Sequence, residues 1–351
     1  MELATKKRAL SELGIFFQEA VAEYKGESIK TKHVELTELR NQLVNTIDSV
    51  KHENGWFTSE SVLSALEAWT VSLQEDKIDK WLSPYLFDNI SSKKVGIIMA
   101  GNLPLVGLHD ALCVLVSGNQ LYAKLSSKDR GLMIITLNAL KSLTKEWSSS
   151  IVLTENMKEI DVLIATGSDN SARYFDYYFR EKKRLIRKNR TSIAVLNGNE
   201  TEQELEGLSH DIFTHYGLGC RNVTKLYVPK NYDLDHVFKA LFPYKEIANH
   251  NKYANNYDYN KAIYLLNKVE LIENGFILFK EDEGLHSPVG VLFYEFYDSL
   301  DDLEHIMEQN KDSIQCIVTN ENLKDGISFG KAQAPELWDY ADGVDTIEFL
   351  L

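Results

Sequence analysis

The middle of the chain alternates short apolar runs with helical patterns, and this alternation limits the possible folds more than any other feature. Apolar runs of strand length lie at residues 95–99, 121–124, 161–166 and 192–196, with helical periodicity clearest over 133–143. Parallel strands need a crossover connection, usually a helix, so this order predicts a doubly wound α/β sheet. Ligands of such sheets bind at the carboxyl ends of the strands. The turns expected at that edge are 101–102, 124–126 and 167–168.

A helical segment precedes this region and a second α/β region follows it. Residues 1 to about 90 place apolar side chains on one helical face, as Val62, Leu66 and Trp69 do. A chain of 351 residues is long for one hydrophobic core, so we predict two α/β domains. The predicted parts are a helical segment with a dinucleotide-binding domain (1–198), a catalytic domain (199–338) and a tail for oligomerisation or a domain-packing strand (339–351).

Two other stretches have unusual composition. Residues 249–259 are rich in Asn and Tyr and are predicted to be an exposed loop. Residues 180–190 form a basic run that suits the phosphates of coenzyme A or of a 2′-phosphorylated nicotinamide cofactor. The alternative is that this run is simply the solvated face of a helix.

Charge and cysteine content narrow the class of protein. A net charge of -14 disfavours sequence-independent binding to nucleic acid or to an anionic membrane. The 3 cysteines are widely spaced and form no CxxC, which argues against a disulfide framework or a zinc site and favours a reducing compartment. No apolar stretch reaches the length of a membrane span and no signal core is recognisable, so we expect a cytoplasmic protein.

Cys220 is the strongest candidate for a catalytic residue. Gly217 and Gly219 predict a tight bend just before it, and a β-rich run begins at Val223. A thiol on such a turn is placed like a nucleophile, and just past a domain junction it would lie in the cleft between the domains. The alternative is a small buried hydrophobe, the usual environment of a cysteine. His215 is a candidate base, although a histidine at a helix end is often structural.

Three groups at the predicted strand ends suit ligand binding. The Asn102 amide can donate a hydrogen bond to an oxyanion, or it caps the next helix, for which Pro104 suits the first turn. Lys124, Ser126 and Ser127 suit a ribose and phosphate, or form a solvated strand end. Gly167 and Ser168 would let backbone amides approach a pyrophosphate, although the GxGxxG fingerprint is absent.

These segments, in this order, resemble the aldehyde dehydrogenase superfamily, and more closely its LuxC-type acyl-CoA reductase branch. The similar segments are 101–105 (Asn-x-Pro-Leu), 117–124 (Gly-Asn to Lys), 166–168 (Thr-Gly-Ser), 217–220 (nucleophile) and 287–290 (Pro-Val). The resemblance implies two doubly wound α/β domains with the active site in the cleft between them. It also implies Cys220 as nucleophile, Asn102 as oxyanion donor, and a nicotinamide cofactor at Lys124, Ser126, Ser127, Gly167 and Ser168.

The departures from the family pattern direct the functional prediction. Hydrolytic members carry a water-activating Glu upstream of the nucleophile, where this chain is aligned with Val195; Glu200 or Glu202 would be the substitutes. NAD-preferring members carry a Glu where this chain has Ser127, which points to NADPH. A second ribose-binding Glu of the family falls at Gly284.

We therefore predict NADPH-dependent reduction of an acyl thioester, such as acyl-CoA, to an aldehyde through a cysteine acyl-enzyme. The alternatives are an NAD(P)-dependent aldehyde dehydrogenase and a cysteine acyltransferase or thioesterase that needs no nicotinamide. The resemblance also implies a homo-oligomer.

Overall fold

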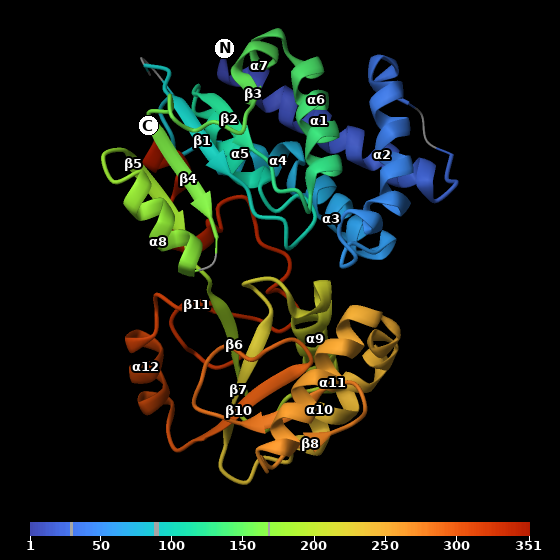
Figure 1. Cartoon of the computed structure of the whole chain (residues 1–351), viewed down its shortest axis with the longest axis vertical. Helices are drawn as coiled ribbons and strands as arrows, with labels where there is room; N and C mark the ends of the chain where they lie inside the picture. The colour runs from blue at the N-terminus through green and yellow to red at the C-terminus, as the bar shows by residue number, and fades with distance from the viewer. Residues whose placement is uncertain (29–30, 88–90, 168) are drawn as a thin grey trace. The chain divides into compact units, whose positions relative to one another are not determined.

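The computed structural model describes residues 1–28, 31–87, 91–167 and 169–351 (Figure 1). The chain divides into two compact units, one formed by residues 1–188 with 336–351 and the other by residues 189–335. Each unit is described by itself below. In the part of the chain that the structure describes, no helix combines the length and apolar character needed to cross a bilayer.

The first unit begins with the helical segment expected before residue 90. Its helices are α1 (Leu3–Tyr24), α2 (Thr37–Ser49), α3 (Ser59–Ser72) and α4 (Glu75–Leu82), with 3-10 turns η1 (Val34–Leu36) and η2 (Val50–His52). Helix α1 buries Leu10, Leu13 and Phe17, whose spacing puts them on one helical face. That face packs against α2, α3, α4 and also the later helix α6 (Arg130–Leu143), which joins the segment to the rest of the unit.

A parallel sheet forms the centre of the first unit. Its strands are β1 (Lys94–Ile98), β2 (Gln120–Lys124), β3 (Ile151–Leu153), β4 (Val162–Thr166) and β5 (Lys183–Arg187), in the order β3-β2-β1-β4-β5. Helices α5 (Leu108–Val116), α6, α7 (Lys145–Ser150) and α8 (Asp169–Tyr178) lie between them in the chain. The chain runs outward in one direction from β1 to β2 and β3, and in the other from β4 to β5. The point between β1 and β4 is therefore the switch point of a doubly wound sheet.

The second unit is built on a seven-stranded sheet in the order β12-β11-β6-β7-β10-β9-β8. The strands are β6 (Thr191–Val195), β7 (Val223–Pro229), β8 (Ile272–Glu273), β9 (Leu278–Glu281), β10 (Val291–Tyr297), β11 (Ile314–Val318) and β12 (Gly326–Ile327). All pair in parallel except β8 with β9. Its α-helices are α9 (Glu202–Phe213), α10 (Leu234–Leu241), α11 (Asn251–Leu266) and α12 (Leu300–Gln309). Because β6 pairs with β7 and β11, the division between units falls after Lys188 rather than near residue 198.

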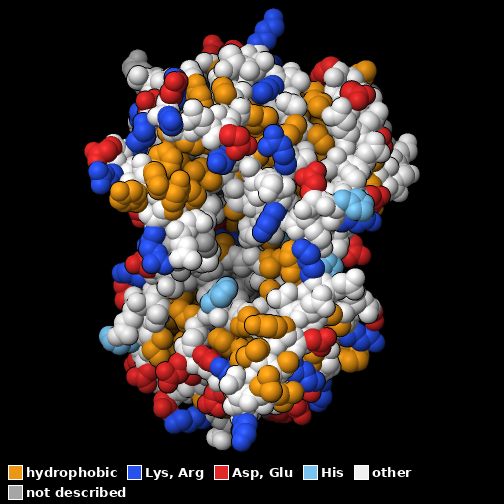
Figure 2. Space-filling view, viewed as in Figure 1, with side chains coloured by type: hydrophobic (Ala, Val, Ile, Leu, Met, Phe, Trp, Pro, Cys, Tyr) orange, Lys and Arg blue, Asp and Glu red, His pale blue; other side chains and the backbone are white. Residues whose placement is uncertain are grey.

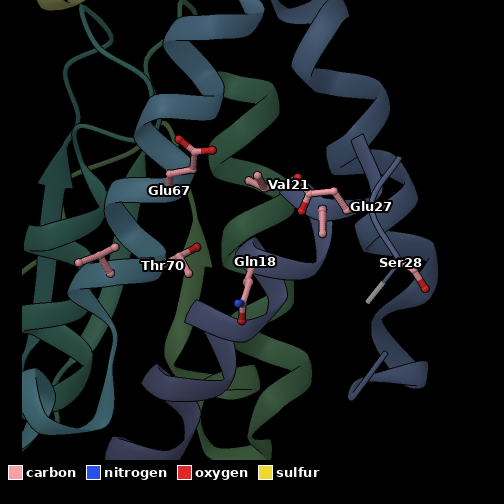
Figure 3. Close-up of a pocket in the computed structure, with 8 residues that line it drawn as sticks. Gln18, Val21, Glu27, Ser28, Glu67 and Thr70 are labelled. Carbon is pink, nitrogen blue, oxygen red and sulfur yellow. The ribbon is translucent and has the colours of Figure 1, made fainter. Parts of the chain in front are cut away.

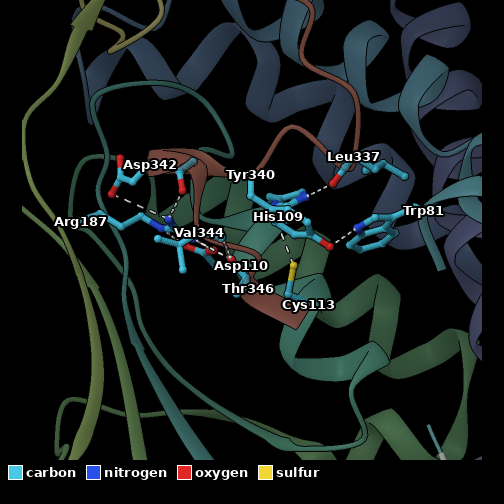
Figure 4. A network of polar contacts seen from close by, with 11 residues as sticks. Trp81, His109, Asp110, Cys113, Arg187, Leu337, Tyr340, Asp342, Val344 and Thr346 are labelled. Carbon is cyan, nitrogen blue, oxygen red and sulfur yellow. Dashed lines mark hydrogen bonds and ion pairs between the residues drawn. The ribbon is translucent and has the colours of Figure 1, made fainter. Parts of the chain in front are cut away.

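The C-terminal tail returns to the first unit. Residues 336–351 contain η5 (Ala341–Gly343) and helix α13 (Thr346–Leu350), which packs on α5, so the tail forms no packing strand, and its role in oligomerisation stays a prediction. Arg187 at the end of β5 holds the tail by donating to the Ala341 carbonyl at 2.7 Å and to Thr346 Oγ1 at 2.8 Å (Figure 4). Arg187 also donates to both carboxylate oxygens of buried Asp110, at 3.1 and 2.7 Å.

Two predictions about local structure are wrong. Residues 249–259 lie largely in helix α11 instead of a loop. His250 caps the first turn of this helix, and the side chains of Tyr253 and Tyr257, one turn apart, are buried. The basic run at 180–190 forms edge strand β5 and the turn before it, and not the face of a helix. Its last strand residue, Arg187, is buried in the ion pair with Asp110, so this side chain is unavailable to a phosphate.

Candidate active site

The turn that carries Cys220 follows α9 through a strained reversal. His215, Tyr216 and Gly217 all adopt left-handed backbone angles, with φ of 51°, 61° and 74°. Such angles are costly for residues with a side chain and persist only where the surroundings fix them. The Tyr216 ring lies 4.3 Å from the His250 ring, centroid to centroid, which packs this reversal against the start of α11. Cys220 itself is exposed, so it is not the buried hydrophobe of the alternative interpretation.

Asn222 ties this turn to the elements around it. Its Oδ1 accepts from the Gly219 amide at 2.8 Å, and its Nδ2 donates to the carbonyls of Asp211, Ile212 and Thr214 at 3.1, 3.2 and 2.9 Å. Asn222 is fully buried, which strengthens each bond. From β6, Ser192 Oγ donates to the Cys220 carbonyl at 3.0 Å. The end of α9, the thiol turn and the start of β6 therefore form one connected structure.

Asp211 and Arg221 extend this network to residues 330–333. The Asp211 carboxylate accepts from the Gly330 and Ala332 amides at 2.7 and 3.0 Å, and Arg221 Nε donates to the Ala332 carbonyl at 2.5 Å. Burial raises the pKa of Asp211 to about 6, although the backbone amides and Arg221 oppose this effect. Sequence reasoning missed both Asn222 and Asp211. The sequence carries no signal for them, since their partners are backbone groups brought together by the fold.

The candidate base His215 and Glu200, a candidate substitute for the water-activating Glu, have different surroundings. Burial lowers the pKa of His215 to about 4, so at neutral pH its imidazole is uncharged. Glu200 caps its own loop, accepting from the Asn197 and Gly198 amides at 2.5 and 3.2 Å and from the Tyr232 hydroxyl at 3.0 Å. That His215 acts as the base for Cys220 remains a prediction.

Val195, Glu200 and Glu202 lie at the carboxyl ends of the strands of the second sheet, whereas Cys220 lies at the amino ends. Strands β6 and β7 are parallel, with Ser192 beside Val223 and Val195 beside Tyr227. Cys220 precedes the amino end of β7, whereas Glu200 and Glu202 follow the carboxyl end of β6. The expectation that Glu200 or Glu202 replaces a water-activating base is therefore wrong. Position 195 is not beside the thiol either, so the alignment of Val195 with that base does not hold in space.

In the first unit, Asn102 lies on the loop between β1 and α5. It is exposed, and α5 begins only at Leu108 with Gly107 as its N-cap residue, so neither helix capping by Asn102 nor a first-turn role for Pro104 is correct. The loop is fixed on both sides of Asn102. The buried Asn54 Nδ2 donates to the Gly101 carbonyl at 3.1 Å, and the Leu105 amide donates to Asp129 Oδ2 at 2.8 Å.

Lys124 is the last residue of β2, and Ser126 and Ser127 follow it, beside this loop. The side chain of Lys124 is 41% exposed, and its Nζ lies 3.7 Å from Glu155 Oε2, a carboxylate that sequence reasoning missed. Ser126 Oγ accepts from the Lys128 amide at 3.2 Å, and Ser126 packs so tightly on Gly101 that a Cβ there would clash. Ser127 is exposed.

Gly167 follows the carboxyl end of β4. Its amide donates to the Arg187 carbonyl at 3.3 Å, and a Cβ added to it would meet the Ser171 Cβ at 2.8 Å. Ser168 lies outside the described residues. The Asn102 loop and Gly167 thus flank the switch point, with Lys124 on the next strand. An exposed ammonium, two hydroxyls and a glycine at a helix start can bind the phosphates and ribose of a dinucleotide, so the residues present fit a nicotinamide cofactor.

Two surface features of the first unit lie apart from these groups. A pocket of about 290 Å³ between α1 and α3 is lined by Val21, Glu67 and Thr70 among others, and includes none of the predicted site residues (Figure 3). Hydrophobic side chains gather on the flank of this unit where α8 lies (Figure 2). There Tyr174, Tyr177 and Tyr178 are all exposed, with the rings of Tyr174 and Tyr178 4.1 Å apart.

Comparison with known proteins identifies the fold. No family model matches the sequence, and no curated protein matches it. Aldehyde dehydrogenase 21 from Physcomitrella patens, solved with its reaction product succinate, matches 100% of this chain and 84% of its own, with a TM-score of 0.65 and 12% identity. An NAD-dependent aldehyde dehydrogenase from Sinorhizobium meliloti matches 91% of this chain and 70% of its own, with a TM-score of 0.63 and 11% identity. A mutant indole-3-acetaldehyde dehydrogenase from P. syringae, solved with NAD+ and IAA, covers 91% and 72%, with a TM-score of 0.61 and 14% identity. The chain therefore has an α/β fold of the aldehyde dehydrogenase type.

Proposed function

We propose, from the premise that the chain has the fold of the aldehyde dehydrogenases, that it is a nicotinamide-dependent oxidoreductase that links aldehydes and acyl thioesters through Cys220. The observation that carries this proposal is the exposed Cys220 thiol on a turn fixed by buried Asn222. A nucleophile held in one orientation needs little reorganisation before attack. A purely structural cysteine would not require an exposed thiol on so constrained a turn.

Reduction of a thioester is the direction that we favour. The Cys220 thiolate attacks the acyl carbonyl, the Asn102 amide donates a hydrogen bond to the oxyanion, and the C–S bond to the donor breaks. The donor, such as coenzyme A, leaves as a thiolate that takes a proton from water, and the acyl group remains on the Cys220 sulfur. A nicotinamide held at Lys124, Ser126, Ser127 and Gly167 would supply the hydride that reduces this carbonyl carbon. Hydride addition leaves a hemithioacetal oxyanion on the Cys220 sulfur. Its collapse breaks the remaining C–S bond, releases the aldehyde and regenerates the Cys220 thiolate without a proton transfer.

The position of the acidic groups supports a thiol rather than water as the acyl partner. Glu200 and Glu202, the substitutes considered for a water-activating base, lie at the sheet edge opposite to Cys220, and Glu200 is engaged in its own loop. Neither glutamate can therefore activate water beside Cys220, which supports reduction of the acyl-enzyme or its transfer to a thiol.

The charges at the end of β2 support NADPH as the cofactor. Lys124, Lys128 and Arg130 bring three cations to this strand end, where the carboxylate of Glu155 lies 3.7 Å from Lys124 and 3.8 Å from Arg130 and that of Glu53 accepts from the Gly131 amide. The local excess of positive charge attracts a 2′-phosphate. Ser127 adds no negative charge where a carboxylate would repel that group.

A second candidate is aldehyde oxidation to a free acid, which the solved structures favour because they are aldehyde dehydrogenases. One assay separates the candidates. The purified protein is incubated with a panel of acyl-CoAs and NADPH under aldehyde trapping, and separately with aldehydes and NAD+ or NADP+, with and without coenzyme A.

Trapped aldehyde that requires NADPH, and its loss in Cys220→Ala, are the expected results. Free acid formed from aldehyde without coenzyme A identifies the second candidate instead. Acyl transfer or thioester hydrolysis that is unchanged when NADPH is omitted identifies a cysteine acyltransferase or thioesterase. Normal turnover by Cys220→Ala contradicts all three.

A further inference from the structure

We propose that Asp129, assisted by Asn54, is a positioning residue that holds the loop 101–105, and with it the candidate oxyanion donor Asn102, in one conformation. This inference rests on the proposed function, in which Asn102 is the oxyanion donor. Asp129 does not touch the substrate in this proposal. It acts through the backbone of Leu105, three residues after Asn102.

Leu105 is the point at which the loop is strained. Its φ is 57°, in the left-handed region that a leucine rarely adopts, and its side chain is buried. Such a conformation persists only when its neighbours fix it. The hydrogen bond from the Leu105 amide to Asp129 Oδ2, at 2.8 Å, fixes the amide of this residue, while its carbonyl accepts from the Leu108 amide at 3.0 Å.

Asp129 is unusual among the carboxylates of this unit. It is 1% exposed, and its second oxygen, Oδ1, has no hydrogen-bond partner among the described residues. A buried carboxyl with half of its hydrogen bonding unused costs free energy. Burial of the Asp129 carboxyl at the start of α6 is explained if this group serves to fix the Leu105 amide that donates to it.

Asn54 fixes the other end of the same loop. Its Nδ2 donates to the Gly101 carbonyl at 3.1 Å, and its Oδ1 accepts from the Trp56 amide at 3.1 Å. Neighbouring Glu53 accepts from the Gly131 amide at 3.3 Å, at the start of α6. Both flanks of Asn102 are thus attached to the same small region, which leaves the loop one preferred conformation.

The protonation state of Asp129 gives this arrangement a measurable signature. Burial, together with the charge of Glu53, raises the pKa of Asp129 to about 8, while the Leu105 amide opposes the shift. Below that pH the carboxyl is neutral and still accepts from Leu105 through Oδ2. Above it, a buried charge next to Glu53 is disfavoured, so the loop is expected to rearrange and activity to fall.

The test compares Asp129→Ala, Asp129→Asn and Asn54→Ala with Thr136→Val as the matched control. Thr136 lies on the same helix, is fully buried, and also has a hydroxyl without a partner in the described part of the chain. Each variant is assayed for kcat and for the KM of the nicotinamide cofactor from pH 6 to 9. Backbone hydrogen exchange over 101–107 is followed by mass spectrometry in the same full-length proteins.

We expect Asp129→Ala to lower kcat by about tenfold, since removing an oxyanion donor outright costs roughly 100-fold or more. The cofactor KM should rise less than kcat falls, because Lys124 on β2 is untouched, although Ser126 packs on Gly101 of the loop. Exchange over 101–107 should accelerate in Asp129→Ala and Asn54→Ala. Asp129→Asn, which keeps an acceptor for Leu105, should retain activity at pH 7 and lose the fall in kcat near pH 8. Thr136→Val should match the wild type in every respect.

Wild-type kcat with unchanged exchange over 101–107 in Asp129→Ala overturns the inference. An equal fall in Thr136→Val, or a change confined to cofactor KM, overturns it as well. If the wild type turns over neither thioesters nor aldehydes, the proposed function fails, and exchange over 101–107 still decides whether Asp129 fixes the loop. If Asp129→Ala does not fold, Asp129→Asn and Asn54→Ala give the same decision.

Discussion

Asn222 is the residue that ties the candidate nucleophile to its unit. Its four hydrogen bonds reach the Gly219 amide and three carbonyls at the end of α9. Asn222→Ala removes all four bonds inside the protein, and although Gln333 Nε2 still donates to the Asp211 carbonyl at 3.3 Å, we expect a loss of about 2–3 kcal/mol in the free energy of unfolding. We also expect a lower kcat, because the Cys220 turn loses its fixed orientation. Urea unfolding and steady-state kinetics measure the two effects.

Asn310→Ala is the control for this prediction. Asn310 Nδ2 donates to the Ile306 carbonyl at 2.8 Å at the end of α12. The Asn310→Ala substitution therefore removes a side-chain amide from another helix end of the same unit. Its effect on kcat should be small. Equal kcat values for the two variants would mean that Asn222 supports stability alone.

The residues that were predicted and those that were missed differ in where their evidence lies. Cys220 is marked by the local glycines, and Asn102 and Lys124 by the strands that they follow. Asn222 and Asp129 act on backbone groups supplied by other segments, so no local pattern reveals them. The pairing of Glu155 with Lys124 likewise depends on β3 lying beside β2.

Strand β5 is the element in which sequence and structure differ most. Its sequence is Lys-Arg-Leu-Ile-Arg, and a charged edge strand has the composition of a solvated helix face. The ion pair of Arg187 with Asp110 makes it a structural element. Arg187→Met leaves the Asp110 carboxylate buried without its partner, so we expect a loss of about 3–5 kcal/mol in the free energy of unfolding. Limited proteolysis should also cleave the tail faster, because Arg187 holds the Ala341 carbonyl and Thr346.

Arg184→Met, in the same strand, is the matched control. Its ion pair with Asp176 is half-exposed, with side chains 30% and 49% accessible, so its loss should cost less than about 1 kcal/mol. Similar losses in both variants would contradict the structural role assigned to Arg187.

The ends of β2 and β3 carry the prediction on cofactor choice. Glu155 faces Lys124 and Arg130, so Glu155→Gln removes the negative charge nearest to the proposed 2′-phosphate site. We expect the ratio of kcat/KM for NADPH over that for NADH to rise about threefold to tenfold, since one exposed charge contributes roughly 1 kcal/mol.

Glu159→Gln serves as the control because Glu159 forms an exposed ion pair of the same length, 3.7 Å, with Lys94 at the amino end of β1. It should leave the ratio unchanged. If Glu155→Gln alters neither cofactor's kcat/KM, the dinucleotide does not lie at this strand end.

At the scale of the whole molecule, the buried parallel strands were the most predictable part. The runs at 95–99, 121–124, 161–166 and 192–196 correspond to β1, β2, β4 and β6, because strands covered on both faces are apolar throughout. The assignment of β6 to the second sheet was not predictable, since its sequence resembles that of β1 or β4. Helix α11 was missed because polar Asn and Tyr residues conceal the pair Tyr253 and Tyr257 that it buries.

The return of residues 336–351 to the first unit has a consequence for synthesis on the ribosome. The polypeptide emerges from its amino end, so the second unit is complete before the last segment of the first unit exists. Until then, Arg187 lacks Thr346 and the Ala341 carbonyl, and α5 lacks the cover of α13. Residues 1–188 therefore remain partly assembled until residues 336–351 have been synthesised. Chaperones would meet this nascent form, in which the surface that α13 covers is still open to water.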